Sequence, residues 1–227
     1  MQEHAFTWFS LLPQPDHLEG GVLVALLVLG FGAVVGWRIR RTEAAIEPED
    51  GVTARNLGEA FVEAMSGLAE GVIGPGSARY VPLLAAFFAY IIVANMVGLV
   101  PGLSPPTAEF NMTLGLGVVS FVAYNVYGVR EHGLKYVRQF TGPILVLAPL
   151  MFCIEVFSHL FRPISLGIRL FANLFADHQV VEIFTQLTYP PIPVAFLFLG
   201  AFVGVVQAFV FTMLSAVYIS LAVSHEH

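Results

Sequence analysis

Charged side chains are scarce in this chain. Only 11% of its 227 residues are Asp, Glu, Lys or Arg, against about 25% in soluble globular proteins. Apolar residues make up 57%, and several apolar runs reach the ~17 to 25 residues that cross a bilayer as a helix. The alternating pattern typical of barrel strands is missing. The composition therefore predicts an all-α membrane protein.

Cysteine and basic tracts are also scarce. Cys153 is the only cysteine, so the sequence offers no disulfide framework and no CxxC metal pair. The lack of a basic tract argues against a nucleic-acid partner. Residues 1–19 contain no Lys or Arg, and we expect no signal peptide there because its positive region is missing.

The few basic residues indicate how the chain crosses the membrane. Arginines follow the first apolar run, whereas the loop at 101–111 has no Lys or Arg. By the positive-inside rule, the N-terminus is external and, if the spans alternate, the C-terminus is cytoplasmic. Eight of the ten basic residues then lie in segments assigned to the cytoplasm or at their edges: Arg38, Arg40, Arg41, Arg55, Arg79, Arg130, Lys135 and Arg138.

We expect one membrane domain with about five membrane helices. An external segment, 1–19, precedes the spans 20–37, 80–100 and 112–129 and two longer helices, 142–187 and 194–223. At 1.5 Å per residue the last two would be ~69 and ~45 Å long, well beyond the ~30 Å hydrocarbon core. They must be strongly tilted, bent or broken into a hairpin.

Residues 54–73 predict an amphipathic helix on the cytoplasmic surface. Its apolar face contains Leu57, Phe61, Met65, Leu68 and Val72, and its polar face contains Arg55, Glu59, Glu63 and Glu70. Because acidic side chains are not attracted to anionic lipid, we expect this helix to contact protein.

A polar stripe stands out in the apolar stretch from Glu155 to Glu182. At ~100° per residue, six polar side chains fall within about 80° of one another: Glu155, His159, Arg162, Arg169, Asn173 and Asp177. His178 and Glu182 point roughly the other way. Pro163 interrupts the hydrogen-bond ladder near the middle, so the alignment across it is approximate.

Arg169 has apolar neighbours and no acid within one helical turn. An arginine near the bilayer centre costs about 2.5 to 3.5 kcal/mol and cannot lose its proton. We therefore expect its counter-ion on another chain; an intrachain pair with Gln207 or Asp177 is the alternative. For Arg162, close to Pro163, snorkelling to an interface is the simpler expectation.

The acids and histidines of the stretch, Glu155, His159, Asp177, His178 and Glu182, can bind and release protons. Such groups along membrane helices are typical of a proton path. A buried structural role for His178 remains open. A metal site at His159, Asp177 and His178 is disfavoured because they are 18 and 19 residues apart and form no local ligand motif.

Two motifs carry a family resemblance over about residues 20–227. The run PISLGIRLFANLFADHQ resembles the signature of subunit a of the F-type ATP synthase, and VQAFVFTMLSAVYISLA resembles its last helix. NMVGLVPG and PPTAEFNMTLGLGV are further matches. The resemblance implies a non-catalytic, proton-translocating stator subunit without cofactors.

The resemblance also implies residue roles. Arg169 would face the carboxylate of the rotating c-ring, with Asn173 and Gln207 as polar neighbours. Glu155 and the Asp177–His178 pair would belong to the half-channel that opens outside. Gly200 occupies a point where some relatives carry a titratable His or Glu, so Asp177 or His178 would take that duty.

The implied partners are the c-ring, the peripheral-stalk b subunits and membrane lipid, with protons as the only small-molecule substrate. The implied location is a bacterial inner membrane. Two rivals stay open: a self-contained proton-coupled transporter, and an intramembrane metalloenzyme using His159, Asp177 and His178.

Overall fold

The computed structural model describes residues 16–41, 53–99, 105–133, 136, 148–187 and 191–224. These residues form helices and no strand, which confirms the predicted all-α class. The predictions for the N-terminal segment up to residue 15, the charged linker, the start of the 142–187 helix and the last three residues lie outside the described residues. The long helices are α1 (Asp16–Arg41), α2 (Ala54–Ile73), α3 (Val81–Val97), α4 (Phe110–His132), α6 (Ala148–Leu187) and α7 (Pro191–Val223).

Five of these helices are apolar. In the described part of the chain, α4, α6 and α7 are long and apolar enough to cross a membrane, and α1 and α3 carry shorter apolar segments. The helix count therefore matches the expected five spans plus the amphipathic α2.

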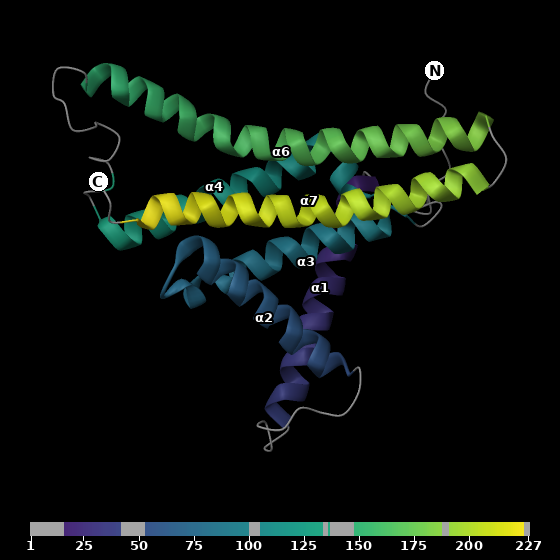
Figure 1. The fold of residues 1–227 in the computed structure, drawn as a ribbon, viewed down its shortest axis with the longest axis horizontal. Coiled ribbons are helices and arrows are strands. Elements are labelled where there is room, and N and C mark those ends of the chain that lie inside the picture. Colours follow the sequence, from purple (N-terminus) through teal and green to yellow (C-terminus); the bar gives the residue numbers. More distant parts are fainter. Residues whose placement is uncertain are drawn as a thin grey trace.

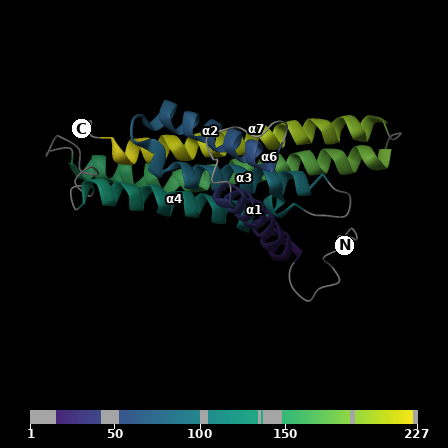
Figure 2. The ribbon, with the colours of Figure 1, turned by 90° about the horizontal axis from the view of Figure 1, so that it is seen from below.

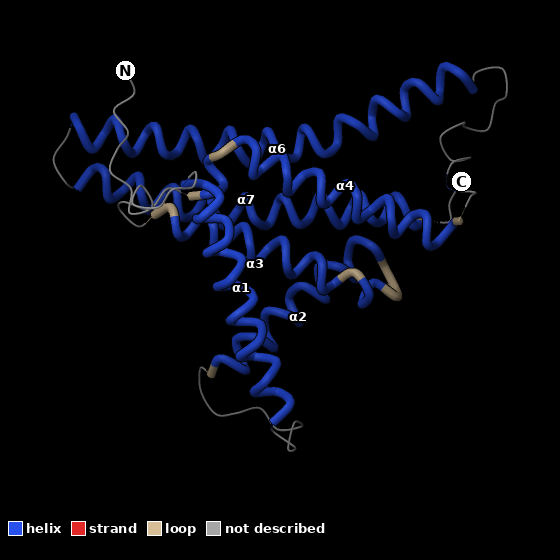
Figure 3. The backbone as a smooth tube through the Cα atoms, turned by 180° about the vertical axis from the view of Figure 1, so that it is seen from behind, coloured by secondary structure: helices blue, strands red, loops and turns tan. Residues whose placement is uncertain are grey.

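The two last helices form the long side of the molecule. α6 and α7 run side by side in opposite directions, with α3 and α4 packed along them (Figure 1). The same alignment is seen from below (Figure 2). α1 crosses their long direction instead of following it, which the view from behind also shows (Figure 3). If α1 crosses the bilayer along its normal, α6 and α7 lie obliquely, as their lengths require.

α6 continues through Pro163 as a single curved helix (Figure 1). Two glycines allow α4 to approach this region closely. A Cβ on Gly117 would overlap the carbonyl oxygen of Pro163. On the opposite helix, a Cβ on Gly167 would come within 3.0 Å of the Cα of Leu114. The two backbones therefore touch where α4 crosses α6.

We expect Gly117→Val to push α4 and α6 apart. Forcing a larger side chain into a packed contact costs about 1 to 3 kcal/mol, so the thermal midpoint of the assembled protein should fall. The matched control is Gly115→Val, because Gly115 is exposed and has open space at its Cβ. Equal midpoints for the two variants would contradict the close contact.

α2 packs its apolar side chains against protein, in agreement with the expected protein contact. Met65 and Ala69 are buried with Tyr80 and Leu84 of the α3 region and with Ile219 of α7. The predicted faces are wrong at the start of the helix, where Leu57 is 57% exposed and Arg55 only 3%. Arg55 can be buried because its Nε donates to Glu59 Oε1 at 2.7 Å, which compensates its charge.

Candidate functional site

The middle of α6 presents a cation to the outside of the molecule. Arg169 and Asn173 are exposed, while Leu166, Leu170 and Leu174 are buried against α3 and α7. The buried leucines recur every four residues and fix the helix rotation. This packing leaves the Arg169 side of α6 uncovered.

Asn173 joins the two long helices beside that cation. Its side-chain amide donates to Gln207 Oε1 of α7 at 2.7 Å, and Gln207 is 4% exposed. No hydrogen bond or ion pair joins Arg169 to another side chain among the residues that the structure describes. An intrachain pair with Gln207 or Asp177 is therefore not supported.

Toward the α6–α7 connection, Asp177 faces α7. A Cβ on Gly200 would lie 4.0 Å from the Cβ of Asp177, and Asp177 Oδ2 is buried without a hydrogen-bond partner. His178 is half-buried and interacts electrostatically with Asp177 and Glu182. Glu182 is exposed. The missing side chain at Gly200 leaves the carboxylate of Asp177 as the titratable group at this helix contact.

Glu155, His159 and Arg162 form a separate cluster near the start of α6. His159 Nδ1 lies 3.5 Å from Glu155 Oε1, and an Arg162 amine lies 3.8 Å from the same oxygen. The Arg162 guanidinium also sits 5.4 Å from the ring centroid of Tyr218 on α7. The Arg162 side chain is thus half-buried, in contact with Glu155 and Tyr218, and its snorkelling to an interface stays a prediction.

Glu155 lies apart from Asp177 and His178 on α6, and their expected place in one half-channel stays a prediction. Along the continuous α6 these residues are about 33 Å apart at 1.5 Å per residue, on opposite sides of Arg169. By the same rise His159 is about 27 Å from Asp177, so His159, Asp177 and His178 cannot ligate one metal ion. The polar stripe therefore divides into a cluster near the start of α6, a central cation and a pair toward the α6–α7 connection.

The sequence reading missed several polar contacts between helices. Asn95 of α3 donates to the Gly204 carbonyl at 2.9 Å and accepts a hydrogen bond from Thr107. Ser120 of α4 and Ser215 of α7 share a hydrogen bond of 2.9 Å. Single polar residues inside apolar runs were the available signal, but their partners could not be read from the sequence.

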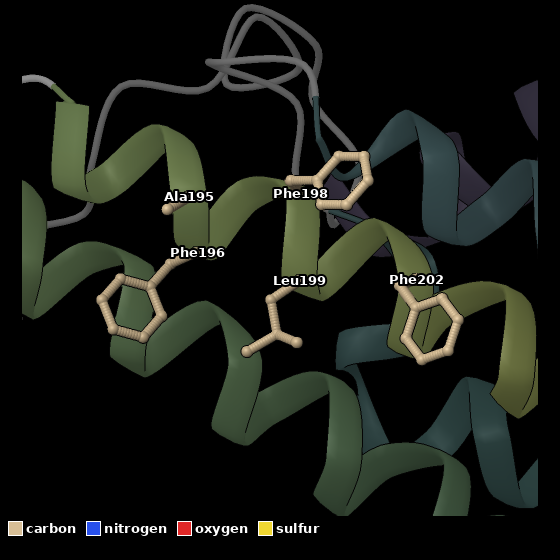
Figure 4. A pocket seen from close by; sticks show the side chains of 5 residues that line it. All are labelled: Ala195, Phe196, Phe198, Leu199 and Phe202. Carbon is tan, nitrogen blue, oxygen red and sulfur yellow. The ribbon is translucent and has the colours of Figure 1, made fainter.

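One open pocket of about 410 Å³ lies on α7. Its lining is apolar and consists of Ala195, Phe196, Phe198, Leu199 and Phe202 (Figure 4). The ring of Phe196 stacks on Phe184 of α6 at 4.4 Å between centroids. Without a polar side chain among these five residues, the pocket has no group that could orient a polar substrate.

Comparisons with known proteins show which family this chain resembles. The model of the family described as ATP synthase A chain matches residues 21–220. ATP synthase subunit a of Bdellovibrio bacteriovorus is 40% identical over 228 residues, covering 98% of this chain and all of that protein. Its counterpart from Sorangium cellulosum is 43% identical over 202 residues, covering 88% of this chain and 79% of the relative.

Proposed function

This chain belongs to the ATP synthase subunit a family, and on that premise we propose that it conducts protons across the membrane by passing them to and from a rotating ring of c subunits. Membership makes it a membrane-embedded part of the ATP synthase complex. The proposed role is that of the stator, which does not itself synthesise or hydrolyse ATP.

The observation that carries the proposal is the exposed Arg169 on an apolar helix, which has no hydrogen-bond or ion-pair partner among the described residues. A permanent cation in lipid is costly, so the assembled complex must place an anion against it. A carboxylate on each c subunit supplies that anion and leaves again as the ring turns. The Asn173–Gln207 hydrogen bond holds the two helices together beside this contact.

The divided polar stripe suggests two aqueous half-channels. Asp177, His178 and Glu182 would line the outer one, and Glu155 with His159 would line the inner one. A proton enters through one half-channel and neutralises a ring carboxylate. The protonated carboxyl group then moves through the lipid as the ring turns. Arg169 then favours the ionised carboxylate and so releases the proton into the other half-channel. Its positive charge also blocks direct proton transfer between the two.

The driving force is the membrane potential together with the proton gradient. Each proton that crosses 100 mV supplies about 2.3 kcal/mol. We place the chain in a bacterial inner membrane with its N-terminus outside and its C-terminus in the cytoplasm, where peripheral-stalk b subunits would hold it against rotation. The oblique α6 and α7 would follow the curved wall of the ring.

Glu155→Gln tests the inner half-channel. We expect passive proton uptake by vesicles that carry the membrane sector to slow about a hundredfold, the lower end of the range for losing one proton-transfer group. The amount of assembled complex should not change. Glu63→Gln, at an exposed glutamate of α2, is the matched control and should conduct normally.

Two results would count against the proposal. Unchanged uptake in Glu155→Gln would remove Glu155 from the path. Proton conduction by vesicles that contain this chain without a c-ring would point instead to a self-contained transporter.

A further inference from the structure

A hydrogen-bond chain converges on His159 from three segments of the protein. Tyr136, from the connection between α4 and α6, is 5% exposed. Its hydroxyl donates to Asn125 Oδ1 of α4 at 3.0 Å and lies 3.5 Å from His159 Nε2 of α6. On the other side of the imidazole, Nδ1 faces Glu155 Oε1 at 3.5 Å.

The site is shaped to hold Tyr136. A Cβ on Gly128 would overlap the Tyr136 ring, so glycine at this position makes room for it. The ring of Tyr124 packs against the imidazole edge to face, with 5.7 Å between centroids. His159 is thus held by rings and hydrogen bonds and cannot turn freely.

The direction of the hydrogen bonds follows from Asn125. Its Nδ2 donates to the Phe121 carbonyl at 2.8 Å, which turns Oδ1 toward Tyr136 as an acceptor. Burial raises the pKa of the Tyr136 hydroxyl above its ordinary value, so the hydroxyl stays protonated and its one hydrogen goes to Asn125. Toward His159 the Tyr136 oxygen can therefore only accept.

This direction decides which imidazole nitrogen carries a proton. His159 Nε2 must be the donor to Tyr136, which leaves Nδ1 of the neutral ring as a lone pair facing Glu155. Two acceptors facing each other repel, and one added proton between them removes the repulsion. That proton can sit on Glu155 Oε1 or on Nδ1, and moving it breaks one O–H bond and forms one N–H bond.

We propose that Asn125 and Tyr136 are positioning residues that fix the Nε2–H form of His159, so that Glu155 and His159 share one exchangeable proton. This inference rests on the proposed function. Within that function, the Glu155–His159 pair holds a transferable proton in the inner half-channel. Among the residues that the structure describes, the charged groups facing the pair are Glu155 itself and Arg162. The uncharged phenols there are Tyr124 and Tyr136, with Tyr218 packed on Arg162.

Tyr136→Phe tests the inference because it keeps the ring and removes the hydroxyl. His159 can then carry its proton on Nδ1 and donate to an ionised Glu155, so the pair gives up the shared proton more readily. In membranes carrying the whole complex, the pH of half-maximal proton conduction should fall by about one unit, the effect of losing one hydrogen bond. Asn125→Leu should shift the profile in the same direction, because it frees Tyr136 to donate to Nε2.

Tyr127→Phe is the matched control. Tyr127 is also on α4 and packs edge to face on Tyr80, away from His159, so its profile should equal that of the unmodified complex. Nitrogen-15 NMR of histidine-labelled complex gives a second readout, with the His159 signal identified by its loss in His159→Gln. We expect Nε2–H in the unmodified protein and a gain of Nδ1–H in Tyr136→Phe.

An unmoved pH profile and an unmoved tautomer in both Tyr136→Phe and Asn125→Leu would overturn the inference. If Tyr136→Phe does not assemble, Asn125→Leu alone decides by the same criteria. Arg169→Ala in the same membranes separates the two levels: ATP synthesis driven by a proton gradient at the normal rate would contradict the proposed function. Loss of that synthesis, combined with an unmoved pH profile in Tyr136→Phe, would contradict only the shared proton.

Discussion

Arg169→Ala is expected to abolish ATP synthesis driven by a proton gradient. Without the guanidinium, nothing forces a ring carboxylate to release its proton on reaching the stator. A nearby cation changes the ionisation equilibrium of a carboxylate by about 10- to 1,000-fold, so synthesis in vesicles should fall about a hundredfold or more. Assembly should persist, because the exposed side chain contributes no hydrogen bond or ion pair to the part of the fold that the structure describes.

The control for this variant is Arg130→Ala. Arg130 is an exposed arginine at the end of α4, outside the stripe, and its loss should leave synthesis close to normal. The measurement is ATP formed per unit of assembled complex under an imposed gradient. Coupled synthesis at the normal rate in Arg169→Ala would contradict the role of this residue.

Moving a carboxylate across the α6–α7 contact should preserve function. Asp177→Gly is expected to slow proton uptake about a hundredfold, the lower end of the range for losing a proton-transfer group. Adding Gly200→Asp should restore most of the rate, because the two Cβ positions are 4.0 Å apart and either helix can present the carboxylate to the same space.

A misplaced carboxylate provides the control for this exchange. Ala195 is an exposed small residue of α7 five positions away, so Asp177→Gly combined with Ala195→Asp should stay as slow as Asp177→Gly alone. Proton uptake per assembled complex is the measurement. Equal rescue by Gly200→Asp and Ala195→Asp would show that the contact between positions 177 and 200 does not matter.

The helices themselves could be predicted from local sequence. The apolar runs gave the all-α class and the number of membrane helices, and the excess length of the last two runs required oblique packing. Arg169 stood out because an isolated cation in an apolar stretch needs a partner. These inferences depend on composition and periodicity, which a single sequence contains.

Contacts between distant segments could not be predicted in the same way. A helical wheel shows the direction of each side chain around the axis but not its position along the axis. It therefore placed Glu155 and Asp177 in one stripe, although they are many turns apart. Tyr136 meets residues 11 and 23 positions away, and a single sequence contains no signal for contacts between such separate segments. Burial of Arg55 likewise depended on its pairing with Glu59.

The central claim is that the Arg169 face of α6 meets the rotor, and cysteine cross-linking tests it most directly. Ala172 is exposed one turn from Arg169, so Ala172→Cys can report on the contact without removing a polar group. The exposed Cys153 should first be replaced by serine. Val126, exposed on α4, provides the control position.

The predicted result is a cross-linked product between Ala172→Cys and a c subunit that carries a cysteine near its carboxylate, with no such product from Val126→Cys. ATP hydrolysis before cross-linking should distribute the product over all c subunits of the ring. Efficient cross-linking of Val126→Cys to the ring, with none from Ala172→Cys, would contradict the account.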